Sequence, residues 1–156
     1  PKDYGNVFNT ISLCFSKGLG CPVGSVLLGS KSDIEEALRI RKVLGGGMRQ
    51  AGYLAAAASY AIKNHRGDLK NDHIKAHEIA QTLKTSALID HVAPVETNIV
   101  IFSLISSEDE NEFIQKMRTK GIFFISLGKG KLRMVTHRDY TDEQHDYVLA
   151  TLTKLD

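Results

Sequence analysis

A single lysine lies in a glycine-rich stretch of the chain, where a reactive amine could be held in place. Lys17 follows residues 7–15, a mostly apolar run of strand length, and glycine occupies three of the seven positions after it. A second apolar run covers residues 23–28, so we expect Lys17 to lie between two buried strands. Burial would lower the pKa of its amine, and a neutral amine is the form that attacks a carbonyl to make a Schiff base.

Other interpretations of this stretch remain open on the residues alone. Gly18, Gly20 and Gly24 allow the backbone to turn tightly and to approach a ligand closely. Glycine-rich loops after strands also occur in nucleotide-binding sites, but those sites need a helix directly after the glycines, and here a strand is expected. A plain turn with an exposed lysine is the remaining alternative.

Two arginines are candidates for binding anionic groups. Arg133 lies in an expected strand over residues 132–136, on the face opposite Leu132 and Met134, and its planar guanidinium suits bidentate capture of a carboxylate. Arg49 comes just after three consecutive glycines, at the expected start of a helix, where it could contact a phosphate or a neighbouring subunit's active site. An exposed strand arginine and a surface cation are the competing interpretations.

A histidine pair raises the question of a metal site. His73 and His77 are four residues apart on an expected helix. No glutamate follows His73 as it does in zinc proteases, and no third ligand is evident. We therefore predict no metal site and treat the pair as helix surface.

The first part of the chain is expected to contain three helices beside the two strands. Ser30 or Ser32 is expected to cap the first helix, which the glycines at 45–47 end. An alanine-rich, buried helix is then expected over residues 48–64. A third helix is expected to start at residues 67–68.

The last part of the chain is expected to form a small lobe with the order βαββα. The elements are expected at residues 98–104 (strand), 107–120 (helix, begun by Ser106 or Ser107), 122–127 and 132–136 (strands joined by a hairpin at 128–130). Thr141 and Gln144 match a capping box, which indicates a final helix.

Composition excludes several classes of protein. The 156 residues suit one domain, and a net charge of +2 without a basic cluster indicates neither a nucleic-acid partner nor an anionic membrane surface. No apolar run has the length of a membrane span. No charged-then-apolar leader is evident either, so we expect a cytoplasmic protein. Two cysteines do not make a disulfide framework.

Three motifs in order along the chain resemble one enzyme family. They are residues 16–25 (Ser-Lys-Gly-Leu-Gly-Cys-Pro-Val-Gly-Ser), residues 41–52 (Arg-Lys-Val-Leu-Gly-Gly-Gly-Met-Arg-Gln-Ala-Gly) and residues 131–137 (Lys-Leu-Arg-Met-Val-Thr-His). Together they are similar to the low-specificity L-threonine aldolases, which are pyridoxal-phosphate (PLP) lyases of the aspartate-aminotransferase fold type. The resemblance covers nearly the whole chain.

The resemblance implies an α/β fold and a division into two parts. Residues 1–90 would be the C-terminal portion of the PLP-binding large domain of a fold type I enzyme, and residues 91–156 a small α/β C-terminal lobe. In the family, a long N-terminal portion precedes the lysine and carries the phosphate-binding residues, a histidine stacked on the cofactor ring and an aspartate paired with the ring nitrogen. None of these has a counterpart here, so the resemblance implies the C-terminal half of such an enzyme.

The resemblance also implies a reaction and roles for three residues. Lys17 would carry PLP, Arg49 would help to bind it, and Arg133 would bind the carboxylate of an amino-acid substrate. The implied reaction is retro-aldol cleavage of L-threonine or L-allo-threonine to glycine and acetaldehyde. The implied partners are the N-terminal half of the same enzyme and further copies in a dimer or tetramer. A related β-eliminating lyase and a non-catalytic fragment are the alternatives.

Overall fold

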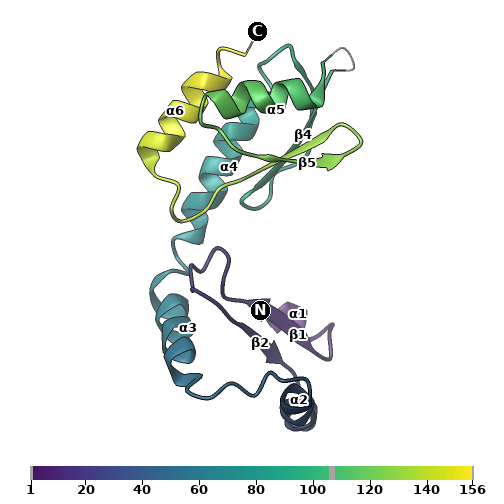
Figure 1. Cartoon of the computed structure of the whole chain (residues 1–156), viewed down its shortest axis with the longest axis vertical. Coiled ribbons are helices and arrows are strands. Elements are labelled where there is room, and N and C mark those ends of the chain that lie inside the picture. Colours follow the sequence, from purple (N-terminus) through teal and green to yellow (C-terminus); the bar gives the residue numbers. More distant parts are fainter. Residues whose placement is uncertain (1, 106–107, 156) are drawn as a thin grey trace. The chain divides into compact units, whose positions relative to one another are not determined.

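The computed structural model describes residues 2–105 and 108–155 of the chain. Two compact units form, residues 1–66 and residues 67–156 (Figure 1). The division at residues 66 and 67 lies ahead of the boundary near residue 90 that the sequence predicts. The assignment of residues 1–90 and 91–156 to a cofactor-binding domain and a small lobe remains a prediction.

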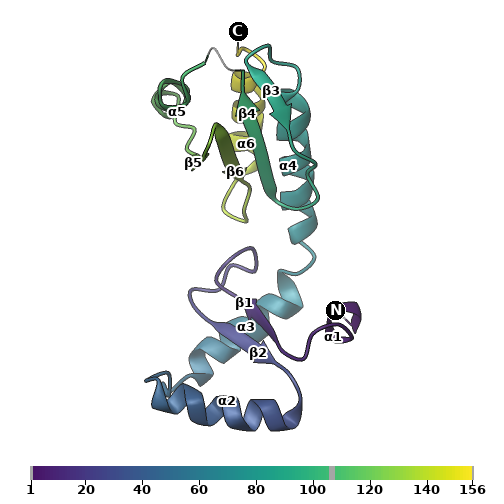
Figure 2. The ribbon, with the colours of Figure 1, turned by 90° about the vertical axis from the view of Figure 1, so that its right-hand side faces the viewer.

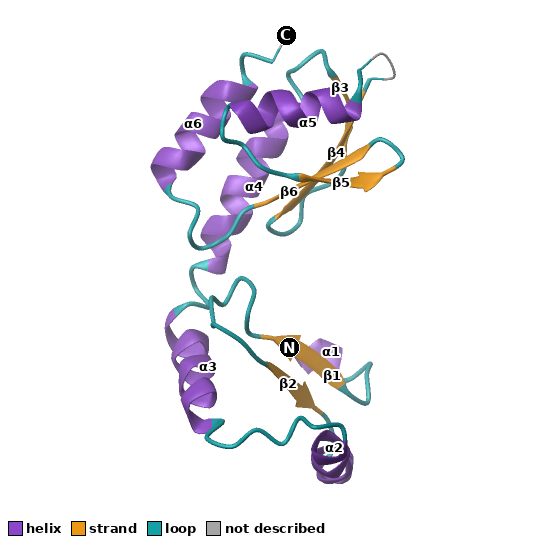
Figure 3. Cartoon of the chain, viewed as in Figure 1, coloured by secondary structure: helices purple, strands orange, loops and turns teal. Residues whose placement is uncertain are grey.

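Over the residues that the structure describes, the first unit combines a two-stranded sheet with three helices, which Figure 3 colours by type of element. Its elements are α1 (Lys2–Gly5), β1 (Ile11–Cys14), β2 (Ser25–Leu28), α2 (Lys31–Val43) and α3 (Gly52–Asn64). Strands β1 and β2 are antiparallel, with Ile11 opposite Leu28 and Cys14 opposite Ser25. The turn between them contains Lys17.

The prediction that β1 and β2 are buried is wrong for the structure described. Leu13, Leu27 and Leu28 are 40%, 42% and 48% exposed. The unit has one small apolar cluster to cover the strands, and this cluster leaves most of their side chains at the surface. An apolar run of this length shows that a strand can be buried, but not what is available to bury it.

Helix α2 begins and ends as expected. The Ser30 hydroxyl accepts a hydrogen bond from the Asp33 amide at 3.2 Å, which satisfies one of the free amides of the first turn. Past its last residue, Gly45 adopts a φ of +81°, a conformation that glycine allows at low cost.

Helix α3 begins four residues later than the sequence predicts. Gln50 has a φ of +53°, which is incompatible with a continuous right-handed helix, and the helix starts only at Gly52. Within α3 only Ala58 and Ala61 are buried, so the prediction of a buried helix is wrong for most of its surface.

In its described residues, 67–105 and 108–155, the second unit is a four-stranded antiparallel sheet with three helices. Its elements are α4 (Leu69–Leu83), β3 (Ile89–Val92), β4 (Ile99–Leu104), α5 (Glu110–Thr119), β5 (Ile125–Gly128), β6 (Lys131–Val135) and α6 (Asp142–Leu152). The strand order is β3-β4-β6-β5. The predicted βαββα lobe is therefore extended by α4, which matches the third helix predicted from residues 67–68, and by β3, which the sequence does not predict.

One apolar core joins these helices to one face of the sheet. Figure 2 shows the ribbons of this sheet and of the three helices from a second side. Its fully buried side chains include Leu83 of α4, Met117 of α5, Leu132 of β6 and Leu152 of α6. Burying one such side chain contributes about 1.5–3 kcal/mol to stability, so this cluster is the main source of cohesion in the unit. In the part of the chain that the structure describes, none of the helices has the length and apolar character needed to cross a membrane.

The two C-terminal helices differ in how well their starts were predicted. Asp109 caps α5, because its Oδ1 accepts a hydrogen bond from the Glu112 amide at 2.8 Å. The predicted caps, Ser106 and Ser107, lie outside the described residues. The predicted capping box of α6 is confirmed: the Gln144 amide donates to Thr141 Oγ1 at 3.2 Å, and the Thr141 amide donates to Gln144 Oε1 at 3.0 Å.

Candidate active site

The turn that carries Lys17 is closed by backbone hydrogen bonds. The amide of Gly20 donates to the carbonyl of Lys17 at 2.7 Å, and the amide of Phe15 donates to the carbonyl of Gly24 at 2.9 Å. Gly20 and Gly24 adopt φ values of +70° and +123°, which residues with a side chain rarely adopt. The glycines at these two positions therefore allow the turn to form.

Buried side chains fix this turn to α3. Phe15 and Cys21 pack against Ala58 and Ala61, whose small side chains permit close approach. The Cys21 thiol also donates a hydrogen bond to the carbonyl of Ala57, with sulfur and oxygen 3.7 Å apart. Lys17 is thus presented by a turn that is anchored on both sides of it.

His65, at the end of α3, provides a further anchor that the sequence analysis missed. Its Nδ1 atom lies 2.8 Å from the carbonyl oxygen of Leu19. A carbonyl oxygen only accepts, so Nδ1 must carry the proton. The ring also meets the Tyr60 ring edge to face at a centroid distance of 5.3 Å. His65 and Leu19 are far apart in sequence, and no local spacing pattern indicates their contact.

The side chain of Lys17 is exposed, contrary to the expectation that it is buried between two strands. Within the described ranges, the ion pairs are made by other side chains. The Lys17 amine is therefore accessible to a carbonyl compound, but residues 2–105 and 108–155 do not supply the predicted desolvation.

Arg49 lies in the loop between the triple glycine and α3, and its side chain is exposed. It precedes the first residue of α3, Gly52, by three positions, so it is not at the helix N-terminus where the sequence analysis placed it. Lys17 and Arg49 belong to the first unit and Arg133 to the second, so no single unit contains all three.

Arg133 lies in β6, between the neighbouring strands of the sheet. It pairs with Ile101 of β4 and with Ile125 of β5. Leu132 and Met134 are buried in the core on the helix-covered face, so Arg133 points to the opposite face, as predicted.

The guanidinium of Arg133 contains an unsatisfied donor. Its Nε atom is buried, and no described residue offers it a hydrogen-bond acceptor. A buried N–H group without a partner costs about 1–3 kcal/mol, unless a ligand or another part of the protein satisfies it. A carboxylate would meet this need, because it accepts two parallel hydrogen bonds from a guanidinium.

A polar cluster surrounds the segment that follows β6 and shifts several pKa values. Burial, and to a lesser degree the charge of Asp146, raises the pKa of Tyr140 to about 12. A hydrogen bond from Lys75, together with its charge, lowers the pKa of Asp142. Burial raises the pKa of Asp72. The sequence does not indicate this cluster, because its members come from two distant segments.

The histidine pair on α4 has no metal-binding arrangement around it. Among the residues whose structure is described, no three His, Cys, Asp or Glu side chains are grouped closely enough to hold a metal ion. His77 instead contacts the side-chain amide of Gln81 at 3.2 Å.

Comparison of the sequence with known families and proteins gives consistent matches. The model of the beta-eliminating lyase family matches residues 1–106. A low-specificity L-threonine aldolase of Arabidopsis thaliana is 37% identical over 145 residues, which are 91% of this chain and 40% of that protein. The low specificity L-threonine aldolase of Escherichia coli K12 is 36% identical over 149 residues, 96% of this chain and 43% of that protein. The chain thus spans well under half the length of these curated relatives.

Solved structures with the same fold come from several PLP enzymes. A Listeria monocytogenes protein, provisionally assigned as an L-allo-threonine aldolase, matches 99% of this chain with 46% of its own, at a TM-score of 0.75 and 18% identity. The ornithine aminotransferase of Toxoplasma gondii, solved with partial PLP occupancy at its active site, matches 94% of this chain with 36% of its own, at a TM-score of 0.66 and 17% identity. These similarities confirm the predicted fold class, that of the fold type I enzymes.

Proposed function

The chain belongs to the beta-eliminating lyase family, and from that premise we propose that it is part of a PLP-dependent lyase. Its reaction is the retro-aldol cleavage of L-threonine or L-allo-threonine to glycine and acetaldehyde. The observation that carries this proposal is the anchored glycine turn, which presents an accessible amine at Lys17 inside the matched segment. The names of the relatives support the choice of substrate.

Lys17 and Arg49 are the proposed cofactor-binding residues. The amine of Lys17 is exposed, and the backbone that carries it is held in a closed turn, so the amine is accessible to the aldehyde group of PLP. The exposed guanidinium of Arg49, beside three glycines, suits a phosphate group. When bound, PLP supplies an electron sink for the bond that breaks at the substrate's α-carbon.

Arg133 is the proposed ligand of the substrate's α-carboxylate. Its unsatisfied Nε and its position in the middle of a three-strand ladder favour a fixed, bidentate contact. By holding the carboxylate, Arg133 would determine which bond at the α-carbon lies in the orientation that reacts. The base that takes the β-hydroxyl proton is expected in the rest of the protein.

Completion of this site is proposed to require further polypeptide. The first unit exposes large apolar side chains, including Val7 (72%), Val43 (78%), Leu44 (80%) and Tyr53 (82%). Large apolar side chains left exposed in this way favour association. We propose that the N-terminal half of the enzyme and further copies in a dimer or tetramer cover it, with residues 1–90 in the cofactor-binding domain and residues 91–156 in the small lobe.

We also propose that the enzyme works in the cytoplasm. Cys14 is a free, exposed thiol and Cys21 is a free, buried one. Free cysteines of this kind are typical of reducing compartments, which supports this location.

Product analysis of the whole, PLP-loaded protein tests the proposed reaction. L-threonine and L-allo-threonine should yield glycine and acetaldehyde in equal amounts. A β-eliminating lyase, the alternative that the family name favours, would instead yield 2-oxobutanoate and ammonia from the same substrates. Elimination products without glycine would contradict the proposal.

A substitution at Arg133 tests the proposed carboxylate contact. Arg133→Lys should weaken amino-acid binding by about tenfold or more while PLP binding persists, because a point charge does not reproduce a bidentate fork. Arg118→Lys is the matched control, since Arg118 is an exposed arginine of the same unit. Equal amino-acid affinity in the two variants would count against this role.

A further inference from the structure

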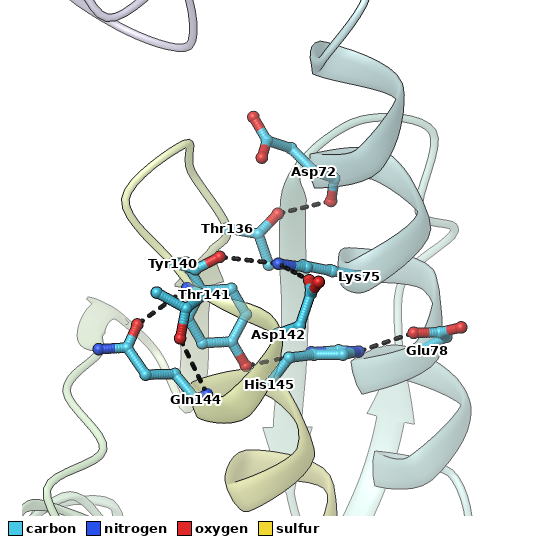
Figure 4. Close-up of polar contacts among 9 residues, drawn as sticks. All are labelled: Asp72, Lys75, Glu78, Thr136, Tyr140, Thr141, Asp142, Gln144 and His145. Atoms are coloured by element: carbon cyan, nitrogen blue, oxygen red, sulfur yellow. Dashed lines mark hydrogen bonds and ion pairs between the residues drawn. The ribbon is translucent and has the colours of Figure 1, made fainter.

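Three residues on one side of α4 hold the segment that leaves β6. Asp72, Lys75 and Glu78 are spaced three positions apart, which places them along one stripe of the helix. Figure 4 shows that each of them contacts a residue of the segment 136–145. This segment begins three residues after Arg133 and runs into the first turn of α6.

The first contact lies at the end of β6. The hydroxyl of Thr136, which is 2% exposed, donates to the backbone carbonyl of Asp72 at 2.6 Å. Asn98 holds the same residue from the other side, because its side-chain amide donates to the Thr136 carbonyl at 2.7 Å. The strand end is therefore fixed between α4 and the start of β4.

The second contact is made by the ammonium group of Lys75. It donates to the carbonyl of Tyr140 at 2.8 Å and lies 2.7 Å from Oδ1 of Asp142. It also lies 5.3 Å from the centre of the Tyr140 ring. The Lys75 side chain is only 14% exposed, so these contacts are shielded from solvent on the lysine side.

The third contact passes through a buried imidazole. Nε2 of His145 lies 2.7 Å from Oε2 of Glu78, and Nδ1 lies 3.1 Å from the Tyr140 hydroxyl. The carboxylate can only accept, so Nε2 carries the proton toward Glu78, and Nδ1 of a neutral ring accepts from Tyr140. Both ring nitrogens of a side chain that is 7% exposed are thus satisfied.

We propose that Lys75, Glu78 and His145 are positioning residues that fix the exit of β6 and thereby the place of Arg133. The proposal rests on the proposed function, in which Arg133 binds the substrate's carboxylate. Hydrogen bonds to β4 and β5 hold β6 from its sides, whereas the stripe on α4 holds the end of the strand. A displacement of about 1 Å in a substrate-binding group can cost up to about a hundredfold in rate. Contacts that keep the end of β6 in place should therefore strengthen the binding of the substrate's carboxylate by Arg133.

The test measures glycine binding and PLP content separately in the whole, PLP-loaded protein. Lys75→Met keeps the apolar stem of the side chain and removes the ammonium, and His145→Phe keeps a ring and removes both hydrogen bonds. Each substitution should raise the dissociation constant for glycine, measured by equilibrium dialysis, by about tenfold. In the cleavage of L-threonine, each should raise KM more than it lowers kcat. PLP content should not change. Lys84→Met is the matched control, since Lys84 is an exposed residue directly after α4, and it should leave all of these values unchanged.

A double-mutant cycle separates positioning from general stabilisation. If Lys75 acts through Arg133, adding Lys75→Met to Arg133→Lys should weaken glycine binding by less than about twofold further. Lys75→Arg should restore most of the affinity, since it can again reach the Tyr140 carbonyl and Asp142. A full additional tenfold loss in the double variant would overturn the inference, as would unchanged glycine affinity in both Lys75→Met and His145→Phe.

The outcome for Arg133 alone distinguishes this inference from the proposed function. If Arg133→Lys leaves glycine affinity unchanged, the carboxylate role of Arg133 is wrong, and the inference falls with it. If Arg133→Lys weakens glycine binding and neither Lys75→Met nor His145→Phe does, the inference alone is wrong.

Discussion

The Nδ1 atom of His65 lies 2.8 Å from the carbonyl oxygen of Leu19, and this contact joins the end of α3 to the turn that presents Lys17. Leu19 is two residues from Lys17, between Gly18 and Gly20. Glycines give the turn its shape but also allow it to open, because they leave the backbone many conformations. A side-chain anchor at this point therefore restricts the motion of the lysine.

Replacing His65 with phenylalanine should loosen the Lys17 turn. The phenyl ring can keep the edge-to-face contact with Tyr60 but cannot donate to the carbonyl of Leu19. Loss of one such hydrogen bond costs about 1 kcal/mol, which corresponds to about a fivefold rise in local opening. Hydrogen exchange of the amides of residues 17–21 should be faster by that factor. His65→Gln, which retains a donor, is the control, and equal exchange rates in the two variants would show that the contact does not restrain the turn.

The core of the second unit should respond very differently to two leucine substitutions on adjacent strands. Leu132 of β6 is fully buried, whereas Leu127 of β5 is 48% exposed. Leu132→Ala should lower the free energy of unfolding by about 2–5 kcal/mol, because it removes buried contacts and leaves a cavity. Leu127→Ala should change it by less than about 0.5 kcal/mol. Denaturant unfolding compares the two, and similar losses would mean that the helices do not cover the face that carries Leu132.

Tyr140 should titrate later than the other tyrosines. Its pKa, raised by burial and then by Asp146, is about 12, compared with an ordinary value of 10.0. Because the folded value is the higher one, the stabilisation linked to the protonated phenol is present below pH 10 and is lost as the pH rises through about 12. Ultraviolet titration should show one of the five tyrosines ionising in this later range. The late step should be absent from Tyr140→Phe, and its persistence there would assign it to another residue.

The elements that the sequence predicted well are those with a local chemical signal. Thr141 and Gln144 define the start of α6, and Ser30 defines the start of α2, since a side-chain cap acts within a few residues. Strand β3 was missed because it has only four residues, Ile89–Val92, and includes Asp90 and His91. The burial of β1 and β2 was overestimated because burial depends on what packs against a strand, which its own sequence does not state.

In the candidate site, too, the features with a local sequence signal were predictable and those that depend on distant segments were not. The position of Lys17 in a tight glycine turn was predictable, because Gly20 and Gly24 permit backbone angles that other residues avoid. The contact from His65 to Leu19 and the contacts from α4 to residues 136–145 were not predictable. They join segments that are 46 to 67 residues apart, and folding alone brings them together.

The most direct test of the account is to identify the lysine that binds PLP. The whole protein, loaded with PLP and shown to cleave L-threonine, is reduced with borohydride, digested and mapped by mass spectrometry. We predict a phosphopyridoxyl group on Lys17 and on no other lysine, with loss of the label in Lys17→Ala. A stable label on a different lysine in the active protein would contradict the assignment of Lys17 and the function built on it.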